Sequence, residues 1–277
     1  MIHVTYPDGR REPLDVQRLK NIVREACQNI TAADAGLILQ KAQQQLYDGI
    51  QFSELSQALI LSARTLIETD PDYSYVTARL LLDQLRSEAL SFVAGQVELA
   101  TQQQMQTRYA SYFVEYLDKG IALGLLDERL KQFDLERLGQ ALQADRDLQF
   151  NYLGLQTLYD RYFLHHEGSR FELPQAFFMR VAMGLAMNEV EREQKAIEFY
   201  HLLAAFDFMS STPTLFNAGT LRPQLSSCYL TTVNDDLESI YGVIKDNALL
   251  SKFAGGLGND WTPIRALGAH IKGTNGK

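Results

Sequence analysis

Hydrophobic and polar positions follow two different periods in the first ninety residues of the chain. Residues 2–14 alternate between apolar and polar side chains around a Pro-Asp-Gly turn, which predicts a short β-hairpin. Apolar residues then recur three and four positions apart, which predicts four helices, the first of them capped by Asp15. The second helix is expected from Thr31 to Leu46 and the third from Ser56 to Glu68. We therefore expect this part of the chain to form a compact α-rich module.

Residues 91–211 carry helical periodicity almost throughout. Tyr109 and Tyr116 belong to an apolar stripe at helical spacing, within a stretch rich in Gln, Leu, Glu and Arg. A second hairpin is predicted at Glu167-Gly168, and a strongly apolar helix is expected to begin after Pro174. This pattern predicts a helical domain that follows the first module.

The pattern changes again at residue 212, where a loop rich in Pro, Gly and Thr leads into residues 225–233. Their β-branched and aromatic content predicts a strand. Residues 235–254 are predicted to form a helix with an acidic first turn, and a short strand is expected from Trp261 to Arg265, with Trp261 in the core. A parallel strand–helix–strand unit cannot cover both faces of its sheet, so we expect an interrupted domain, through an intein, a split gene or a truncation.

Composition narrows the classes of function. A net charge of −8 over 277 residues supplies no large basic surface, which argues against direct nucleic-acid binding. The chain has no run of eighteen apolar residues and no apolar leader segment, so a cytoplasmic protein without a membrane span is expected. Its two cysteines are too few for a disulfide scaffold or a four-cysteine zinc site, and no metal site is expected.

One of these cysteines, Cys228, lies in the predicted strand beside Ser227, and its role is open on the residues alone. A lone cysteine is commonly a small buried hydrophobe, and a redox thiol or nucleophile at the edge of a pocket is the alternative. The hydroxyls of Thr214 and Ser227 could hold a phosphate together with backbone donors, although most loops of this type are only loops.

Charged residues on both sides of the predicted helix also have two readings. Asp235 and Asp236 either cap the helix or accept hydrogen bonds from a ribose hydroxyl. Arg265 and Lys272 lie among glycines, where cationic side chains could face phosphates.

Five segments decide between these readings because they occur together and in a fixed order: FELPQAFFMRVAMGLA, SSTPTLFNAGT, LSSCYL, DDLESIY and IRALGAHIKGTNGK. As a set they resemble the N-terminal part of the large (α) subunit of ribonucleotide reductase. The resemblance implies a mainly α chain: an ATP-cone of a small hairpin and four helices at residues 1–90, and the helical N-terminal domain at 91–211. It also implies that residues 212–277 are the first strand–helix elements of an incomplete α/β ten-stranded barrel.

The resemblance implies roles for individual residues of the barrel segment. Cys228 corresponds to a redox-active thiol that works with a second cysteine further along the family's barrel. Thr214 and Ser227 correspond to positions that hold the phosphates of the ribonucleotide substrate. The positions that correspond to contacts of the deoxynucleoside triphosphate specificity effector are Asp235, Asp236, Leu237, Arg265 and Lys272.

In the ATP-cone the resemblance implies that residues 12–18 line a pocket for ATP or dATP, among them Glu12, Asp15 and Arg18. Arg18 replaces a usual lysine, and the chain departs from the family pattern at three further positions in this module. Two usual lysines are replaced by Tyr6 and Ser87, and a usual hydroxyl residue is replaced by Phe52. Each lost charge-assisted hydrogen bond removes about 1.5–3 kcal/mol, so we expect weakened binding of a triphosphate.

The resemblance also implies partners. These are the remainder of the large subunit, a second large subunit in a homodimer, a metal-containing small (β) subunit that supplies the radical, and thioredoxin or glutaredoxin. A cobalamin-dependent relative is the second option for the radical source, and diphosphate and triphosphate substrates both remain open. Because the family's radical cysteine lies beyond these 277 residues, we expect no turnover from this chain alone.

Two other functions are considered. The chain could act alone as a nucleotide-binding or regulatory fragment without catalysis. A transcription regulator with an ATP-cone would need a zinc-binding cysteine cluster ahead of the cone, and the sequence has none.

Overall fold

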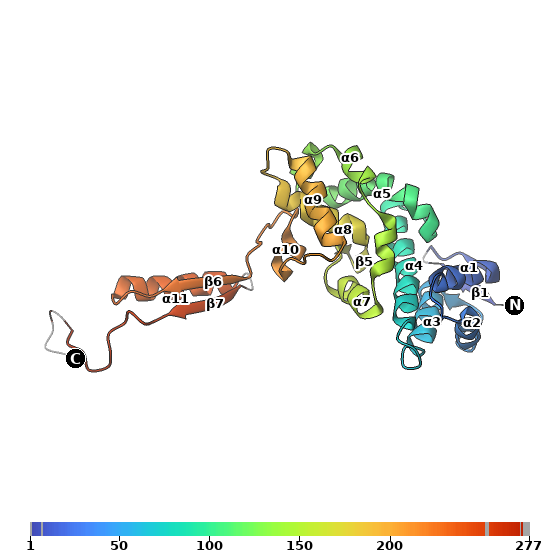
Figure 1. Cartoon of the computed structure of the whole chain (residues 1–277), viewed down its shortest axis with the longest axis horizontal. Coiled ribbons are helices and arrows are strands. Elements are labelled where there is room, and N and C mark those ends of the chain that lie inside the picture. Colours follow the sequence, from blue (N-terminus) through green and yellow to red (C-terminus); the bar gives the residue numbers. More distant parts are fainter. Residues whose placement is uncertain (1, 7, 253–254, 272, 274–277) are drawn as a thin grey trace. The chain divides into compact units, whose positions relative to one another are not determined.

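The computed structural model describes residues 2–6, 8–252, 255–271 and 273, with the elements named in Figure 1. The chain divides into two compact units. The first contains Met1–Met209 and Ala218–Arg222, and the second contains Ser210–Asn217 and Pro223–Lys277. The first unit therefore holds the predicted module and the helical region, and the second holds the strand with Cys228.

The N-terminal module is a three-stranded sheet with four helices. Its elements are β1 (His3–Thr5), β2 (Arg11–Pro13), α1 (Val16–Cys27), α2 (Ala35–Gln43), β3 (Ile50–Gln51), α3 (Phe52–Arg64) and α4 (Tyr73–Ala94). β1 pairs antiparallel with β2 and parallel with β3. In Figure 1 the shorter helices gather around α4, which α1 and α3 contact directly. The predicted hairpin and four helices are confirmed. Strand β3 was not predicted, because a strand of two residues leaves little pattern in the sequence.

Side-chain caps set where the helices of this module begin. The Asp15 carboxylate accepts a hydrogen bond from the backbone N–H of Arg18 at 2.8 Å, as predicted. The second helix begins at Ala35, later than the predicted Thr31, because Asp34 provides its cap by accepting from the N–H of Leu37 at 3.1 Å. The sequence alone could not distinguish Thr31 from Asp34 as the residue that caps this helix.

The rest of the first unit is helical, as predicted. Its elements are α5 (Gln102–Ala122), η1 (Glu128–Gln132), α6 (Leu135–Gln140), η2 (Ala144–Gln149), α7 (Tyr152–Arg161), β4 (His165–His166), β5 (Ser169–Arg170), α8 (Pro174–Ala186) and α9 (Arg192–Ala204). The predicted hairpin is the pair β4–β5, which turns at Glu167 and Gly168 with positive φ angles. Pro174 opens α8, and every residue from Pro174 to Met183 is buried, so α8 is the central helix of this region.

An ion pair without solvent exposure lies beside α8. The Arg180 Nε atom donates to Glu172 Oε1 at 2.7 Å, and both side chains are 0% exposed. Glu172 also accepts from the Tyr116 hydroxyl at 2.5 Å and from the backbone N–H of Leu164 at 2.9 Å. A second Arg180 nitrogen donates to the carbonyl of Ala218 at 2.7 Å. Both charges are therefore paired and hydrogen-bonded, which is the condition for burying them.

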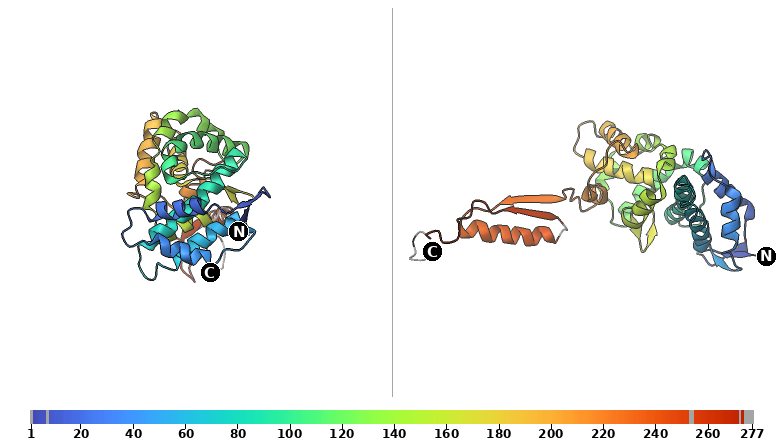
Figure 2. Two further views of the ribbon diagram at one scale, coloured as in Figure 1. Left: turned by 90° about the vertical axis from the view of Figure 1, so that its right-hand side faces the viewer. Right: turned by 60° about the horizontal axis from the view of Figure 1, so that its bottom comes forward.

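The second unit contains α10 (Thr212–Asn217), β6 (Cys228–Thr232), α11 (Leu237–Ser251) and β7 (Gly256–Asp260). β6 and β7 are parallel and in register from the pair Cys228–Gly256 to the pair Thr232–Asp260. Helix α11 lies alongside the two strands and contacts β7 (Figure 2). The unit is thus the strand–helix–strand arrangement that the sequence predicts for the start of a barrel, with two strands and no closed sheet among the described residues.

The predicted strand from Trp261 to Arg265 is wrong, and so is the core position of Trp261. The second strand is β7, and Trp261 follows it with 46% of its surface exposed. The Asp260 carboxylate accepts from the N–H of Thr262 at 2.9 Å, and the N–H of Ile264 donates to the carbonyl of Trp261 at 3.0 Å, so the chain turns here. The glycines of β7 concealed the strand, yet a Cβ atom at Gly258 would lie 2.7 Å from Leu230 Cδ2.

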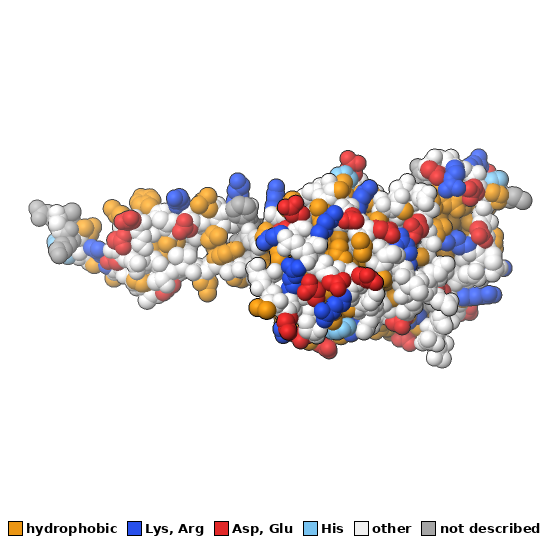
Figure 3. All heavy atoms as spheres, turned by 90° about the horizontal axis from the view of Figure 1, so that it is seen from above, with side chains coloured by type: hydrophobic (Ala, Val, Ile, Leu, Met, Phe, Trp, Pro, Cys, Tyr) orange, Lys and Arg blue, Asp and Glu red, His pale blue; other side chains and the backbone are white. Residues whose placement is uncertain are grey.

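The surface shows mixed charge. On the face shown in Figure 3, Lys and Arg side chains of the first unit are interspersed with Asp and Glu. Among the residues that the structure describes, no helix combines the length and apolar composition needed to cross a membrane. The same described ranges contain no group of three or more His, Cys, Asp or Glu side chains that could hold a metal ion.

Candidate functional site

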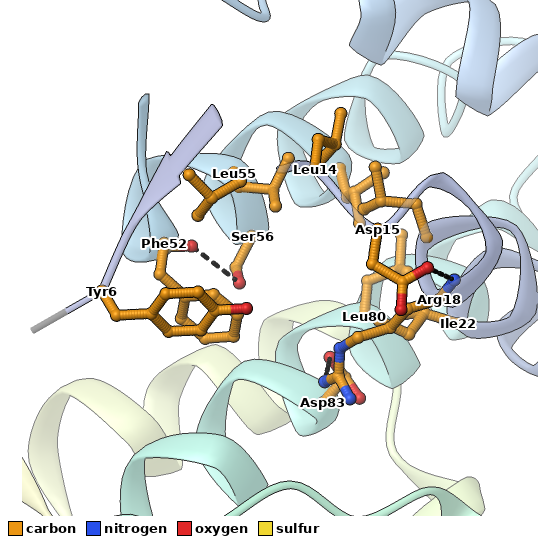
Figure 4. Close-up of a pocket in the computed structure, with 13 residues that line it drawn as sticks. Tyr6, Leu14, Asp15, Arg18, Ile22, Phe52, Leu55, Ser56, Leu80 and Asp83 are labelled. Carbon is orange, nitrogen blue, oxygen red and sulfur yellow. Dashed lines mark hydrogen bonds and ion pairs between the residues drawn. The ribbon is translucent and has the colours of Figure 1, made fainter. Parts of the chain in front are cut away.

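A pocket in the N-terminal module encloses about 480 Å³ of empty space that is partly open to solvent (Figure 4). It lies between β1, α1, α3 and α4. Its lining residues are Val4, Tyr6, Leu14, Asp15, Arg18, Leu19, Ile22, Phe52, Leu55, Ser56, Leu59, Leu80 and Asp83. Apolar side chains make up most of the wall.

Two aromatic rings form one side of this pocket. The rings of Tyr6 and Phe52 are stacked, with centroids 5.2 Å apart and an angle of 20° between their planes. The Arg10 guanidinium lies 5.4 Å from the centre of the Tyr6 ring. Burial is the main cause that raises the pKa of the Tyr6 hydroxyl, so this group stays a neutral hydrogen-bond donor. The pair therefore supplies an apolar surface with one hydroxyl, where the resemblance implies a lysine and a hydroxyl residue.

The charged residues of the pocket are one guanidinium and two carboxylates. Arg18 Nη2 lies 3.8 Å from Asp83 Oδ2, and the Asp83 side chain is only 11% exposed. Burial raises the pKa of Asp83 above its ordinary value, although Arg86 and Arg18 oppose this effect. Asp15 points a carboxylate into the same space while it caps α1. An anionic ligand would thus find a single cation here, which is already shared with a carboxylate.

The structure brings together two of the three predicted cone residues. Asp15 and Arg18 line the pocket, whereas Glu12 is exposed on β2, where it accepts from Arg10 at 3.0 Å, and is not among the lining residues. Ser87 is buried on α4 one turn beyond Asp83 and does not line the pocket either. Sequence reasoning missed Asp83. Its only signal is a carboxylate inside the apolar stretch of α4.

In the second unit, Cys228 is the first residue of β6 and is exposed in this chain. The Ser227 hydroxyl lies 3.6 Å from its sulfur and can donate a weak hydrogen bond to it. The Thr214 hydroxyl donates to the carbonyl of Leu225 at 3.0 Å, which ties α10 to the segment just before Ser227. A Cβ atom at Gly256 would lie 3.6 Å from the Cys228 sulfur, so the opposite strand leaves space beside the thiol.

Three of the remaining predicted residues lie at the N-terminal end of α11, and Arg265 lies in the loop after β7. Asp236 caps α11 by accepting from the N–H of Ser239 at 2.8 Å, and Leu237 follows with 72% of its surface exposed. Arg265 Nε donates to Asp235 Oδ2 at 2.6 Å, so these two residues are brought together. Lys272 lies outside the described residues.

Comparison with known families covers most of the chain. Residues 2–88 match the ATP cone domain, residues 148–223 match the all-alpha domain of ribonucleotide reductase, and residues 226–277 match its barrel domain. The order of the three domains agrees with the fold. The chain belongs to the ribonucleotide reductase large-subunit family.

Relatives of this family align along the whole chain. The chain is 48% identical over 277 residues to the ribonucleoside-diphosphate reductase subunit alpha of Chlamydia trachomatis, covering 100% of this chain and 26% of that protein. It is 38% identical over 275 residues to the subunit alpha of Helicobacter pylori, covering 99% of this chain and 33% of the relative. Identity to the large subunit of Danio rerio is 35% over 278 residues, with 99% and 34% covered. The chain thus spans about a quarter to a third of the length of these relatives and corresponds to their N-terminal portion.

Family membership clarifies what the two units are. The N-terminal module is the ATP-cone of a ribonucleotide reductase large subunit, a domain that supports binding of a nucleotide effector. The second unit is the start of the barrel, with two parallel strands. The pocket in Figure 4 is therefore the candidate effector site, and Cys228 marks the candidate redox site.

Proposed function

We propose that this chain, joined to the remainder of a large subunit, reduces ribonucleoside diphosphates to deoxyribonucleotides. The observation that carries the proposal is 48% identity along all 277 residues to a protein named for that reaction. In this reaction the 2′ hydroxyl of the ribose leaves as water. Two thiols supply the two electrons and two hydrogens and become a disulfide, so atoms and electrons balance.

Cys228 is proposed as one of these two thiols. Its position at the start of β6, beside Ser227, supports this role. The oxidised pair would be reduced again by a partner such as thioredoxin or glutaredoxin. Ser227 beside it and Thr214, whose hydroxyl ties α10 to the same segment, are proposed to hold the substrate's phosphates.

The second unit is also proposed to bind a deoxynucleoside triphosphate that selects the substrate. Asp235, Asp236, Leu237, Arg265 and Lys272 are the proposed contacts. The Arg265–Asp235 ion pair means that Arg265 would have to exchange a carboxylate for a phosphate. Because the pair is exposed, this exchange costs little.

The cone pocket is proposed to take ATP or dATP, with Arg18 facing the phosphates. The described residues that line this pocket all belong to the cone, so nucleotide binding is the function proposed for the chain without the rest of the subunit. The proposed partners of the whole protein are a second large subunit and a metal-containing small subunit that supplies the radical. We propose that it acts in the cytoplasm.

The redox role is tested by Cys228→Ser in the completed large subunit, assayed with its small subunit and thioredoxin. We expect loss of multiple turnover. Cys27→Ser is the matched control, since Cys27 is half-buried on α1 and burial raises its pKa to about 11, which keeps it an unreactive thiol. Unchanged steady-state activity of Cys228→Ser would return this residue to a packing role. The 277-residue chain by itself is expected to show no reductase turnover.

A further inference from the structure

A series of polar contacts runs from the cone pocket into the helical region of the first unit. Arg18 lies 3.8 Å from Asp83, and the other oxygen of Asp83 lies 3.7 Å from Arg86 Nη2. Arg86 Nη1 donates to Gln102 Oε1 at 2.7 Å, and Gln102 Nε2 donates to the carbonyl of Ala144 at 2.8 Å. The series thus begins on α1 at the pocket and ends at the first residues of α5 and η2.

The contacts at the two ends of this series differ in length. The two contacts of Asp83 are longer than a hydrogen bond, whereas the two contacts of Gln102 have ordinary hydrogen-bond lengths. Arg86 is only 3% exposed, yet its Nε atom has no hydrogen-bond partner among the described residues. A buried donor without a partner is unfavourable, so a shift that brings Nε to an acceptor would stabilise this guanidinium.

A second, smaller cavity lies beside the Arg86 side chain. It encloses about 240 Å³ of empty space and is lined by Ile22, Glu25, Ala26, Arg79, Asp83, Arg86, Gln102 and Leu148. Ile22 and Asp83 also line the cone pocket, so the two cavities share a wall. Arg86 and Asp83 thus both border this second cavity.

We propose that a nucleotide phosphate in the cone pocket takes Arg18 from Asp83, that Asp83 then draws in Arg86, and that this weakens the Arg86–Gln102 bond. This inference rests on the proposed role of the cone pocket and concerns its regulation. A buried carboxylate that loses one of two cations gains by approaching the other. Arg86 exchanges a bond to a neutral amide for a bond to a charged group, which is the stronger kind.

The consequence lies outside the cone. Gln102 is the first residue of α5, and its side chain donates a hydrogen bond to the carbonyl of Ala144 at the start of η2. It therefore links these two elements. Loss of the Arg86 bond loosens the first turn of α5 and η2 when the pocket is filled. Coupling of this kind is reciprocal, so loosening Gln102 in advance must strengthen nucleotide binding.

Hydrogen exchange of the full 277-residue chain, with and without Mg²⁺-ATP or Mg²⁺-dATP, tests the first half of the inference. We expect slower exchange at β1 and the start of α1, and faster exchange at the first turn of α5 and at η2. In Asp83→Asn the pocket should still be protected while α5 and η2 no longer respond. Protection of the pocket without any change at α5 and η2 would overturn the inference alone. No protection of the pocket by either nucleotide would contradict the proposed role of the cone and this inference with it.

Nucleotide affinity tests the reciprocal effect of Gln102 on the pocket. A structural defect would weaken nucleotide binding, whereas the proposed coupling predicts stronger binding. Gln102 does not line the cone pocket, and Gln102→Leu should bind ATP about fivefold more tightly than the wild-type chain. Ser87→Ala, a buried change on α4 outside the series, should leave the affinity unchanged. Equal or weaker binding by Gln102→Leu would refute the coupling. If Gln102→Leu does not fold, Arg86→Lys replaces it, because Lys keeps the charge and lacks the second nitrogen with which Arg86 reaches both Asp83 and Gln102.

Discussion

Two arginine–carboxylate pairs in the first unit use the same chemical groups in opposite ways. Arg180 and Glu172 are fully buried and 2.7 Å apart, and Glu172 accepts two further hydrogen bonds. Asp83 instead lies 3.7–3.8 Å from two guanidiniums, beside two cavities, and Arg86 has a buried Nε atom without a partner among the described residues. A saturated pair can only be broken, whereas an unsaturated one can be rearranged by a ligand. The comparison separates a structural ion pair from one that can take part in regulation.

The largest expected effect is on the saturated pair. Glu172→Gln leaves the Arg180 guanidinium buried without a counter-charge, so we expect the free energy of unfolding to fall by about 3–5 kcal/mol. Asp83→Asn is the contrasting variant, and it should lower this free energy by less, because the contacts of Asp83 with Arg18 and Arg86 are 3.7–3.8 Å long. Denaturant unfolding followed by far-UV circular dichroism measures both. Equal losses in the free energy of unfolding for the two variants would contradict the difference between the saturated and the unsaturated ion pair.

A second expected effect comes from Asp147, a buried carboxylate outside both pairs. It accepts hydrogen bonds from the Tyr109 hydroxyl at 2.6 Å and from Gln175 Nε2 at 2.7 Å, yet burial raises its pKa to about 6. The folded state therefore holds a proton that the unfolded chain releases near pH 4. This contribution to stability is complete below about pH 4 and is lost as the pH rises through 6.

The shift corresponds to about 3 kcal/mol between pH 4 and pH 7. Asp147→Asn should remove this part of the pH dependence, which urea unfolding at a series of pH values would measure. Asp145→Asn is the control, because Asp145 is an exposed neighbour two residues away. An identical pH slope in the wild-type chain and in Asp147→Asn would contradict the account.

Much of this fold follows from local patterns in the sequence, and the sites follow only in part. Asp15 was predictable as a cap because its position before an apolar-periodic segment has a local cause. Asp83 was not, because its partners Arg18 and Arg86 come together only when α1 packs on α4. Strand β7 was misplaced since its glycines lower the local signal, while pairing with β6 determines the strand. The roles of Cys228 and its neighbours came from the ordered motifs, because no local pattern distinguishes a redox thiol from a packed one.

The aromatic side of the cone pocket gives a smaller effect in the opposite direction. Tyr6→Lys adds a cation to a pocket that has only Arg18 against Asp15 and Asp83, so triphosphate affinity should rise. One new charge-assisted bond adds about 1.5–3 kcal/mol, or roughly tenfold or more in the dissociation constant of ATP. Isothermal titration of ATP measures it, and Tyr6→Phe controls for loss of the hydroxyl. No gain in affinity would show that charge does not limit binding here.

The most direct test of the account is a titration of Mg²⁺-ATP into the wild-type chain and into Asp83→Asn. If Asp83 holds Arg18 loosely and competes with a phosphate for it, then removal of this carboxylate frees the only guanidinium in the pocket lining. We predict about fivefold tighter binding of ATP by Asp83→Asn than by the wild-type chain. Weaker or unchanged binding by Asp83→Asn would contradict the claim that this ion pair is poised for a ligand.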